Sequence, residues 1–331
     1  MRDSISKIPT GAVRYNTDSN KMEVYIGSTW MEVAVSTPNL DGGARGLAYR
    51  SGGGNQIDLI TIPTAGNATD FGDATNSAGG RFNASSRTRS IAAGGGTPTR
   101  INTIEFSTFS STGNGQDFGD LTQVGAGGGQ MGISNQTRGV FGGRTTPGNS
   151  NTIDYITIAT TGDAVDFGDQ GNTEGGMICF SSPTRGIMGG AHPANTPRIE
   201  FITIATTGNS QEFGSLMHDQ ELSAAASSAT RGVWMGGRYA PSPTNMSTIQ
   251  YVQIQSLGNS MEFGDLTSVR NDSGGMSDCV RAVCYGGGNP DGQVDTIEYI
   301  SISTGGTAID FGNANHSQGY ACTSNGHGGL G

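Results

Sequence analysis

One phrase recurs six times along this chain: an isoleucine-led apolar run, a turn similar to Thr-Gly-Asn, and then Asp/Glu-Phe-Gly. The phenylalanines of the six copies lie 46 to 50 residues apart, at Phe71, Phe118, Phe167, Phe213, Phe263 and Phe311. A period in this range is typical of one supersecondary unit that is copied and stacked, because a single copy cannot bury its own apolar face. The repeated residues are therefore expected to build a scaffold, and function is expected where the copies differ.

Each copy contains four predicted strands. In the third copy they cover residues 139–141, 153–158, 164–167 and 177–180, which are rich in Ile, Tyr, Phe and Thr and bounded by Gly, Asn or Pro. Such runs are strand signals, and none is long enough for a helix. Glycine makes up 56 of the 331 residues and holds fixed places in the copies, which indicates turns and close packing. Four strands in each of six copies predict an all-β, six-bladed β-propeller.

The propeller is expected to cover residues 39–331 and to be closed by a C-terminal strand. The repeats open at residues 45–49, which match the second strand of a blade. They end at residues 319–323, which match a first strand with no second strand after it. Pairing of these two segments would complete the first blade and remove exposed sheet edges.

Residues 1–38 lack the repeat and form a separate predicted domain. Residues 12–15, 21–25 and 29–33 alternate between apolar and polar side chains, and turn compositions separate them. This pattern predicts a three-stranded antiparallel meander. Three strands of this length are marginally stable alone, so we expect the meander to dock on a partner or to oligomerise.

Charge and composition argue against several functional classes. The net charge is −10, and Lys7 and Lys21 are the only lysines, which disfavours nucleic-acid binding through phosphates. No apolar stretch approaches the ~20 residues that cross a bilayer, and residues 1–4 lack the apolar core of a signal peptide. The scattered histidines have no ligand spacing, so neither a metal nor a cofactor is expected.

The Asp-Phe-Gly tripeptide is expected to be structural. In kinases it holds magnesium, but here it recurs without a Gly-rich phosphate loop, a paired strand lysine or a His-Arg-Asp loop. We expect its phenylalanine to pack between adjacent blades and its glycine to permit a bend.

An arginine precedes the second strand of every copy, and an acid follows the leading isoleucine in five copies. The arginines are Arg45, Arg89, Arg138, Arg185, Arg231 and Arg281. The acids are Asp58, Glu105, Asp154, Glu200 and Glu298, with Gln250 in the remaining copy. Because a guanidinium bonds a carboxylate bidentately, these matched positions predict a repeated ion pair or hydrogen-bond ladder. The alternative is a ring of arginines that binds a ligand around the channel.

The loops after the glycine pairs and the loops after Asp-Phe-Gly are expected on one face, because alternate connections of a meander emerge together. The copies diverge most there, and variable loops on a rigid scaffold commonly carry recognition. The candidate contact residues are Arg144, His192, His218, Arg238 and Tyr239. Solvated connectors without a partner are the alternative. Asp219 and Glu221 are the acids on this face that could serve sugar cleavage.

Three resemblances follow from these motifs. Gly142-Gly143, followed by a loop, an apolar strand, a turn and an aromatic, resembles the kelch repeat, with Phe where kelch repeats usually have Trp. The sequence of residues 153–169 is similar to repeats in virion proteins of tailed bacteriophages, particularly those that infect marine cyanobacteria. This resemblance covers residues 45–331. Residues 11–30 resemble a short module of phage tail-fibre and other structural proteins.

The resemblances imply a non-enzymatic structural protein at the tail or capsid surface of a virion. A tail-fibre or tail-associated protein would attach to a host glycan or protein through the propeller loops. Residues 1–38 would contact other virion proteins, with a homo-oligomer or several copies on each particle. A capsid decoration or baseplate component that binds only virion proteins is the alternative, and a polysaccharide-degrading enzyme is the third. Neither nucleic-acid binding nor membrane insertion is implied.

Overall fold

The computed structural model describes residues 8–17, 21–32, 44–96, 98–127, 132–145, 148–173, 175–190, 196–239, 242, 244–317 and 320–331. The chain divides into two compact units, Met1–Gly42 and Gly43–Gly331, which we call the N-terminal unit and the repeat unit. The described parts of both are built from β-strands, with one short 3-10 helix, η1 (Gly328–Leu330), and no α-helix. The all-β class expected from the sequence is therefore correct.

The N-terminal unit is a three-stranded antiparallel sheet with the order β1 (Val13–Asn16), β2 (Lys21–Ile26) and β3 (Thr29–Glu32). Val13 pairs with Val24, and Val24 pairs with Met31, which sets the register of all three strands. The predicted meander is confirmed over these residues. Residues 33–43 lie outside the described residues.

The repeat unit contains six antiparallel sheets, each with four main strands, which we number sheet 1 to sheet 6. Sheet 1 consists of β33 (Tyr320–Ser324), β4 (Arg45–Arg50), β5 (Gln56–Thr61) and β6 (Thr69–Asp73). Sheet 2 consists of β7 (Phe82–Ser85), β8 (Arg89–Ala93), β9 (Thr103–Thr108) and β10 (Gln116–Asp120). Sheet 3 consists of β11 (Gly132–Ser134), β12 (Arg138–Phe141), β15 (Thr152–Thr157) and β16 (Val165–Asp169).

Sheet 4 consists of β17 (Ile178–Ser181), β18 (Arg185–Gly189), β19 (Arg198–Thr203) and β20 (Gln211–Ser215). Sheet 5 consists of β22 (Ala224–Ser227), β23 (Arg231–Met235), β25 (Thr244–Gln253) and β26 (Met261–Arg270). Sheet 6 consists of β27 (Gly274–Ser277), β28 (Arg281–Tyr285), β31 (Thr296–Ser301) and β32 (Ile309–Asn313). Short loop strands also pair: β13 (Arg144–Thr145) with β14 (Asn149–Ser150), β21 (Gln220–Glu221) with β24 (Arg238–Tyr239), and β29 (Gly288–Asn289) with β30 (Gly292–Gln293).

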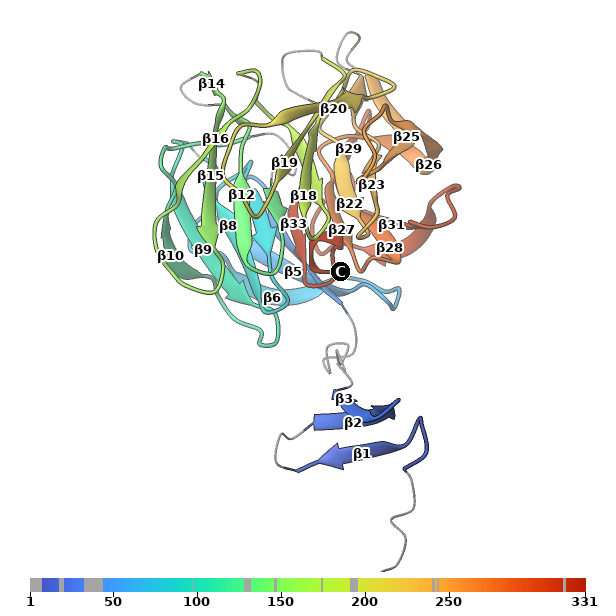
Figure 1. The fold of residues 1–331 in the computed structure, drawn as a ribbon. Helices are drawn as coiled ribbons and strands as arrows, with labels where there is room; N and C mark the ends of the chain where they lie inside the picture. Colours follow the sequence, from blue (N-terminus) through green and yellow to red (C-terminus); the bar gives the residue numbers. More distant parts are fainter. Residues whose placement is uncertain are drawn as a thin grey trace, which may run out of the picture. The chain divides into compact units, whose positions relative to one another are not determined.

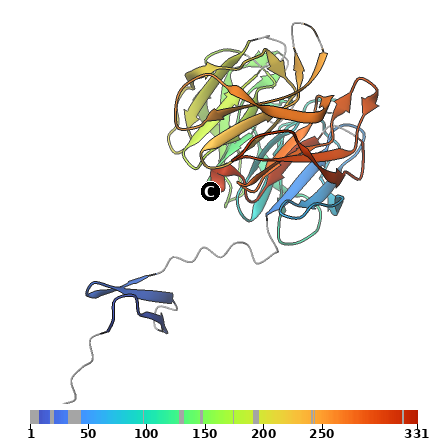
Figure 2. The ribbon, with the colours of Figure 1, turned by 90° about the vertical axis from the view of Figure 1, so that its right-hand side faces the viewer.

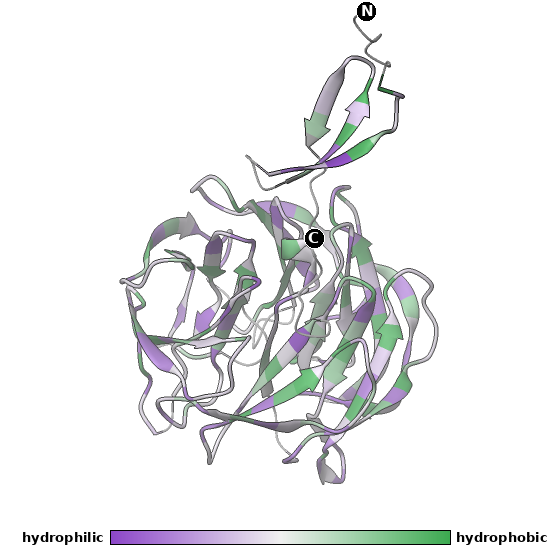
Figure 3. Ribbon diagram, turned by 90° about the horizontal axis from the view of Figure 1, so that it is seen from below, coloured by the Kyte–Doolittle hydropathy of each residue, from purple (hydrophilic) through white to green (hydrophobic). Residues whose placement is uncertain are grey.

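The first sheet joins the two ends of the repeat unit. β33 pairs antiparallel with β4, from Tyr320 opposite Arg50 to Ser324 opposite Gly46. The predicted pairing of the C-terminal segment with the first repeat strand is confirmed. Figures 1 and 2 show the sheets following one another in the colour order of the sequence, and Figure 3 shows apolar segments along their strands.

A turn of each sheet is hydrogen-bonded to the Asp/Glu-Phe-Gly segment of the preceding sheet. The backbone N–H of the turn glycine donates to the phenylalanine carbonyl over 2.7–3.0 Å at all six contacts. The pairs are Gly113 to Phe71, Gly162 to Phe118, Gly208 to Phe167, Gly258 to Phe213, Gly306 to Phe263 and Gly66 to Phe311. The last pair links sheet 1 back to sheet 6. The repeated sequence therefore specifies one contact between neighbouring sheets.

The phenylalanine and glycine of this segment both serve the contact. Phe118 of sheet 2 is buried in one cluster with Phe141 and Ile156 of sheet 3, so the predicted packing between neighbouring sheets is confirmed. The glycine after this phenylalanine is required because there is no room for a side chain at its position. Gly119 has φ +149°, and a Cβ there would lie 2.4 Å from the carbonyl oxygen of Gly162. Close backbone approach and the positive φ together explain why glycine stands at this position.

The predicted pairing of the repeat arginines with the repeat acids is wrong. Each arginine instead donates from Nη1 to a backbone carbonyl of the following sheet over 2.5–3.1 Å. Arg138, for example, bonds Ile204 of sheet 4, and its guanidinium lies 4.8 Å from the ring centre of Tyr155. Arg281 of sheet 6 bonds Ile62 of sheet 1. These arginines therefore join sheets, and the alternative of a ligand-binding arginine ring is not supported by these bonds.

The repeat acids are buried and bond the loop that leaves the preceding sheet. Each acid, or Gln250 in sheet 5, accepts a backbone N–H four residues after the repeat phenylalanine, over 2.6–3.3 Å. Four of them also pair with arginines from four different places in the repeat: Glu105 with Arg81, Asp154 with Arg144, Glu200 with Arg198 and Glu298 with Arg270. Gln250 bonds Gln220 instead, and Asp58 accepts from the Tyr285 hydroxyl at 2.6 Å.

Candidate functional site

The loops after the second strand of each sheet, such as β8, lie on the same face as the loops after Asp-Phe-Gly, as expected. Gly95 donates to the carbonyl of Gly125 at 2.6 Å, and Asn271 donates to Gly288 at 2.8 Å. In sheet 5 the two loops form the β21–β24 pair, with Glu221 opposite Arg238. We call this side of the repeat unit the loop face.

Sheet 5 extends further on the loop face than the other sheets do. Its strands β25 and β26 have ten residues each, whereas the corresponding strands of sheet 4 have six and five. The added length pairs β25 with β24, through Arg238 opposite Asn245 and Tyr239 opposite Thr244. The repeat therefore carries its largest addition at a place where the copies already diverge in sequence.

Four non-repeated residues lie at this addition: His218, Asp219, Arg238 and Tyr239. We call them the β21–β24 cluster. The rings of His218 and Tyr239 lie edge to face with centres 6.5 Å apart, and all four residues are half-buried. Met217 next to them is 43% exposed. An imidazole and a phenol are thus in contact, and the neighbouring guanidinium and carboxyl residues are partly accessible as well, which suits recognition of a polar surface.

Arg238 is fixed in this cluster by a buried acid. Its Nε donates to Glu221 Oε1 at 2.6 Å, and its Nη2 forms an ion pair with the same oxygen. The Glu221 side chain is 3% exposed, whereas that of Arg238 is 29% exposed. The arginine is therefore held in one orientation with part of its guanidinium open to solvent. Glu221 is committed to this ion pair, which separates it in role from the neighbouring Asp219.

The structure brings together three of the five predicted contact residues. His218, Arg238 and Tyr239 belong to the β21–β24 cluster. Arg144 does not contribute to a contact surface: it is 0% exposed and forms an ion pair with the buried Asp154. The prediction for Arg144 was wrong because it was based on the position of this residue in a loop. The ion pair with the buried Asp154 carboxylate instead holds the Arg144 side chain in the interior. His192 lies outside the described residues.

Sequence reasoning missed a ring of serines at the centre of the repeat unit. The first strand of every sheet ends in a serine: Ser85, Ser134, Ser181, Ser227, Ser277 and Ser324. Five of the hydroxyls donate to the serine carbonyl of the preceding sheet over 2.7–2.8 Å. These serines share the period of the phenylalanines. That periodicity was the signal that could have singled them out among many other serines.

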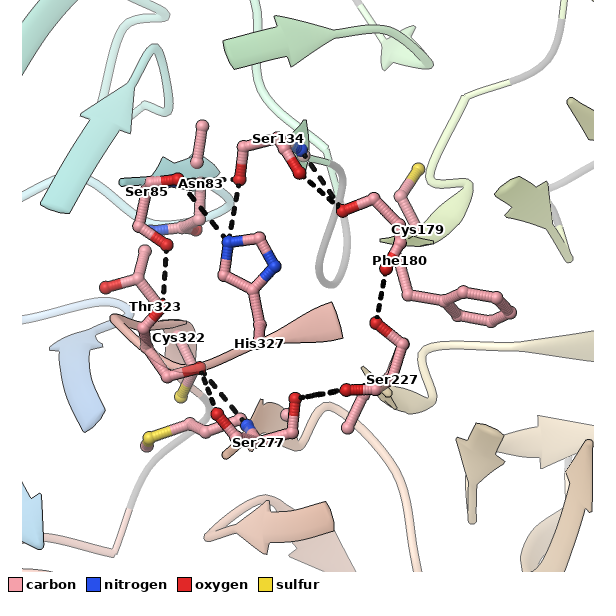
Figure 4. Close-up of a pocket in the computed structure, with 18 residues that line it drawn as sticks. Asn83, Ser85, Ser134, Cys179, Phe180, Ser227, Ser277, Cys322, Thr323 and His327 are labelled. Atoms are coloured by element: carbon pink, nitrogen blue, oxygen red, sulfur yellow. Dashed lines mark hydrogen bonds between the residues drawn. The ribbon is translucent and has the colours of Figure 1, made fainter. Parts of the chain in front are cut away.

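His327 occupies the place where the sixth serine bond would form (Figure 4). Its Nδ1 accepts from the backbone N–H of Gly329 at 3.1 Å, so the proton of the neutral ring is on Nε2. Nε2 lies 3.1 Å from Ser134 Oγ and 3.4 Å from the Ser85 carbonyl oxygen. Burial lowers the pKa of His327 to about 4, partly offset by the Ser85 bond. A neutral imidazole therefore completes the ring.

The C-terminal segment closes the centre of the serine ring from one side. Residues Gly328–Leu330 are buried, and the Leu330 carbonyl accepts from Arg87 at 2.6 Å and from Gln136 at 3.3 Å. The remaining cavity has a volume of about 40 Å³ and is lined by the first strands. This volume suits one or two water molecules.

Within the described ranges, no group of three or more His, Cys, Asp or Glu residues is placed to hold a metal ion. In the same part of the chain, no helix has the length and apolar character needed to cross a membrane. Comparison with models of protein families finds no match, and comparison with curated proteins finds none either.

Proposed function

We propose that this chain is a structural protein of a bacteriophage virion, a tail-fibre or tail-associated protein whose β21–β24 cluster binds the surface of the host cell. The observation that carries the binding role is the addition to sheet 5. There the strands lengthen, β21 pairs with β24, His218 contacts Tyr239, and both of these residues and Arg238 are half-buried. The virion setting comes from the resemblance of the repeats and of residues 11–30 to phage proteins.

We further propose that the six sheets form a six-bladed, kelch-like β-propeller. Three contacts support a closed ring, because each recurs at every junction and also links sheet 6 with sheet 1: the glycine-to-phenylalanine bond, the arginine-to-carbonyl bond and the bond from the loop N–H to the buried acid or Gln250. In addition, β33 supplies the first strand of sheet 1. Such a scaffold holds divergent loops on one face while the repeated contacts stay the same.

A host-binding protein of this kind would act through several weak contacts. The cluster presents one aromatic ring, one imidazole and one guanidinium, which are groups that stack on and hydrogen-bond to glycans and polar protein surfaces. Many copies on one particle would raise the overall affinity through effective concentration. A weak single site is therefore compatible with firm attachment.

The first prediction concerns this site. We expect the labelled full chain to bind cells of marine cyanobacteria, and we expect His218→Ala with Tyr239→Ser to weaken binding by about tenfold or more. Both changes leave the Arg238–Glu221 ion pair in place. Arg100→Ala is the matched control, since Arg100 is exposed in the corresponding loop of sheet 2. Binding is measured by flow cytometry over a series of protein concentrations.

Unchanged binding by the double variant, or a wild-type chain that binds none of a broad panel of host strains, would count against the proposal. Binding to isolated virion proteins alone would favour a capsid decoration or baseplate component. Release of reducing sugar from host envelope polysaccharide would favour an enzyme.

A further inference from the structure

The N-terminal sheet has one face made of apolar side chains. In an antiparallel sheet, residues opposite each other in register share a face, and successive residues alternate between faces. Val13, Val24 and Met31 are opposite one another, and Tyr15 is opposite Met22. Ile26 lies two residues beyond Val24 and so points to the same side. We call these six residues the apolar face.

The apolar face is exposed. Five of its side chains have exposed fractions of 40–59%: Val13 59%, Tyr15 54%, Met22 40%, Ile26 55% and Met31 52%. Scattered exposed apolar residues are normal on a protein surface, but a contiguous set across three strands marks an interaction site.

The opposite face carries charged and aromatic side chains that contact one another. The Arg14 guanidinium pairs with Glu23 at 2.7 Å and lies 4.2 Å from the ring centre of Trp30. Trp30 packs against Tyr25 with ring centres 5.2 Å apart. The Asn16 and Arg14 hydrogen bonds lower the pKa of the Glu23 carboxyl. The two faces therefore differ: these charged and aromatic contacts lie on one face, and the exposed apolar side chains lie on the other.

We propose that the apolar face binds the same face of a second copy of this chain. A face without charged side chains is complementary to itself, which suits the two-fold contact that is commonest among homo-oligomers. Six such side chains present roughly 500 Å², so two faces together bury roughly 1,000 Å², near the lower limit for a specific interface. Three short strands are marginal alone, and this pairing gives them the missing cover.

The self-association deepens the docking role proposed for residues 1–38 and is independent of binding by the β21–β24 cluster. It predicts that the full chain has the mass of a dimer in solution, measured by sedimentation equilibrium. Ile26→Lys is expected to raise the dissociation constant at least a hundredfold, because it places a charge in the apolar contact. Ile309→Lys is the matched control, since Ile309 is 58% exposed in β32 of the repeat unit.

A second experiment separates loss of the interface from loss of the fold. Neither Ile26→Lys nor Ile26→Glu should self-associate, but an equimolar mixture of the two should restore dimers through opposite charges on the facing sheets. A wild-type chain with the mass of one copy would overturn the proposal. Dimers that persist in Ile26→Lys, or a mixture that stays monomeric, would overturn it as well. Loss of dimers with host binding retained would leave the proposed function standing.

Discussion

At the scale of single residues, the imidazole of His327 takes the place of a sixth serine-to-carbonyl hydrogen bond, beside the five that serine hydroxyls form. His327 comes from beyond the last strand, yet it bonds Ser134 of sheet 3 and the Ser85 carbonyl of sheet 2. Both of its nitrogens are used in the neutral form, since Nδ1 accepts from Gly329. Protonation would therefore place a second N–H against the Gly329 N–H and a charge in a buried site. This makes the segment after β33 sensitive to acid.

The pKa of His327 shows in which direction the stability changes with pH. The value is about 4 in the folded chain against an ordinary 6.5, so between these values the unfolded chain binds the proton and the folded chain does not. Stability from this residue is therefore complete above pH 6.5 and is lost as the pH falls toward 4. The loss amounts to roughly 3 kcal/mol.

We expect His327→Gln to remove this part of the acid dependence, because an amide can donate and accept but does not titrate in this range. The measurement is the free energy of unfolding in urea at pH 7 and pH 4 for both proteins. The wild type should lose roughly 3 kcal/mol more than the variant between the two values. Equal losses would show that His327 does not titrate during unfolding.

At the scale of elements, the buried acids show one task solved in several ways. Each acid holds the loop that leaves the preceding sheet, and four of the five acids also have an arginine partner, which comes from a different element in each case. Arg81 precedes β7, Arg144 lies in β13, Arg198 begins β19 and Arg270 ends β26. Sheet 5 has Gln250 and Gln220 at this place. An uncharged amide pair can therefore take the place of the ion pair within the same architecture.

This comparison predicts how the Arg81–Glu105 pair responds to substitution. Arg81→Gln alone should destabilise the chain by about 3–5 kcal/mol, because Glu105 is left as a buried, uncompensated charge. Arg81→Gln with Glu105→Gln should recover most of this loss by imitating sheet 5. Urea unfolding of the wild type, both single variants and the double variant measures the coupling. A double variant whose loss equals the sum of the single losses would contradict the prediction.

The strands and the pairing of β33 with β4 could be predicted from the sequence, but the partners of the buried and half-buried charged side chains could not. Strands and turns follow from local composition, so the four strands of the third copy and the N-terminal meander were placed correctly. The arginine partners depend on how one sheet lies on the next. Arg138 reaches the carbonyl of Ile204, 66 positions further along the chain, and sequence spacing within one copy does not indicate such a contact. Arg144 was wrongly assigned to the surface because the sequence likewise did not indicate its partner, Asp154.

At the scale of the whole molecule, sheet 1 joins the beginning of the repeat unit to its end. β4 has β5 on one side and β33 on the other. Without β33, β4 would become an edge strand and sheet 6 would lose the neighbour of β27. The proposed closed propeller thus depends on a segment of five residues, Tyr320–Ser324, at the far end of the chain.

We therefore expect removal of residues 320–331 to lower the melting temperature of the repeat unit by more than about 10 °C. The reason is loss of the β33–β4 pairing together with the buried His327 segment. The comparison protein lacks residues 1–42, a separate compact unit, and should melt within about 2 °C of the full chain. Differential scanning calorimetry gives both values. Similar melting of the truncated and full chains would argue against closure by β33.

The position of β4 also has a mechanical consequence. The chain enters the repeat unit at Arg45, whose backbone N–H bonds Asn325 Oδ1 at 2.7 Å, and the variable loops leave the strands at their other ends. A pull on the N-terminal segment, directed along the strand, would reach β4 first. Because β4 is bonded along both edges, the force would shear two rows of hydrogen bonds at once instead of peeling one row open. In the proposed attachment, a load between the N-terminal segment and the loop face would thus pass through a strand that is paired on both sides.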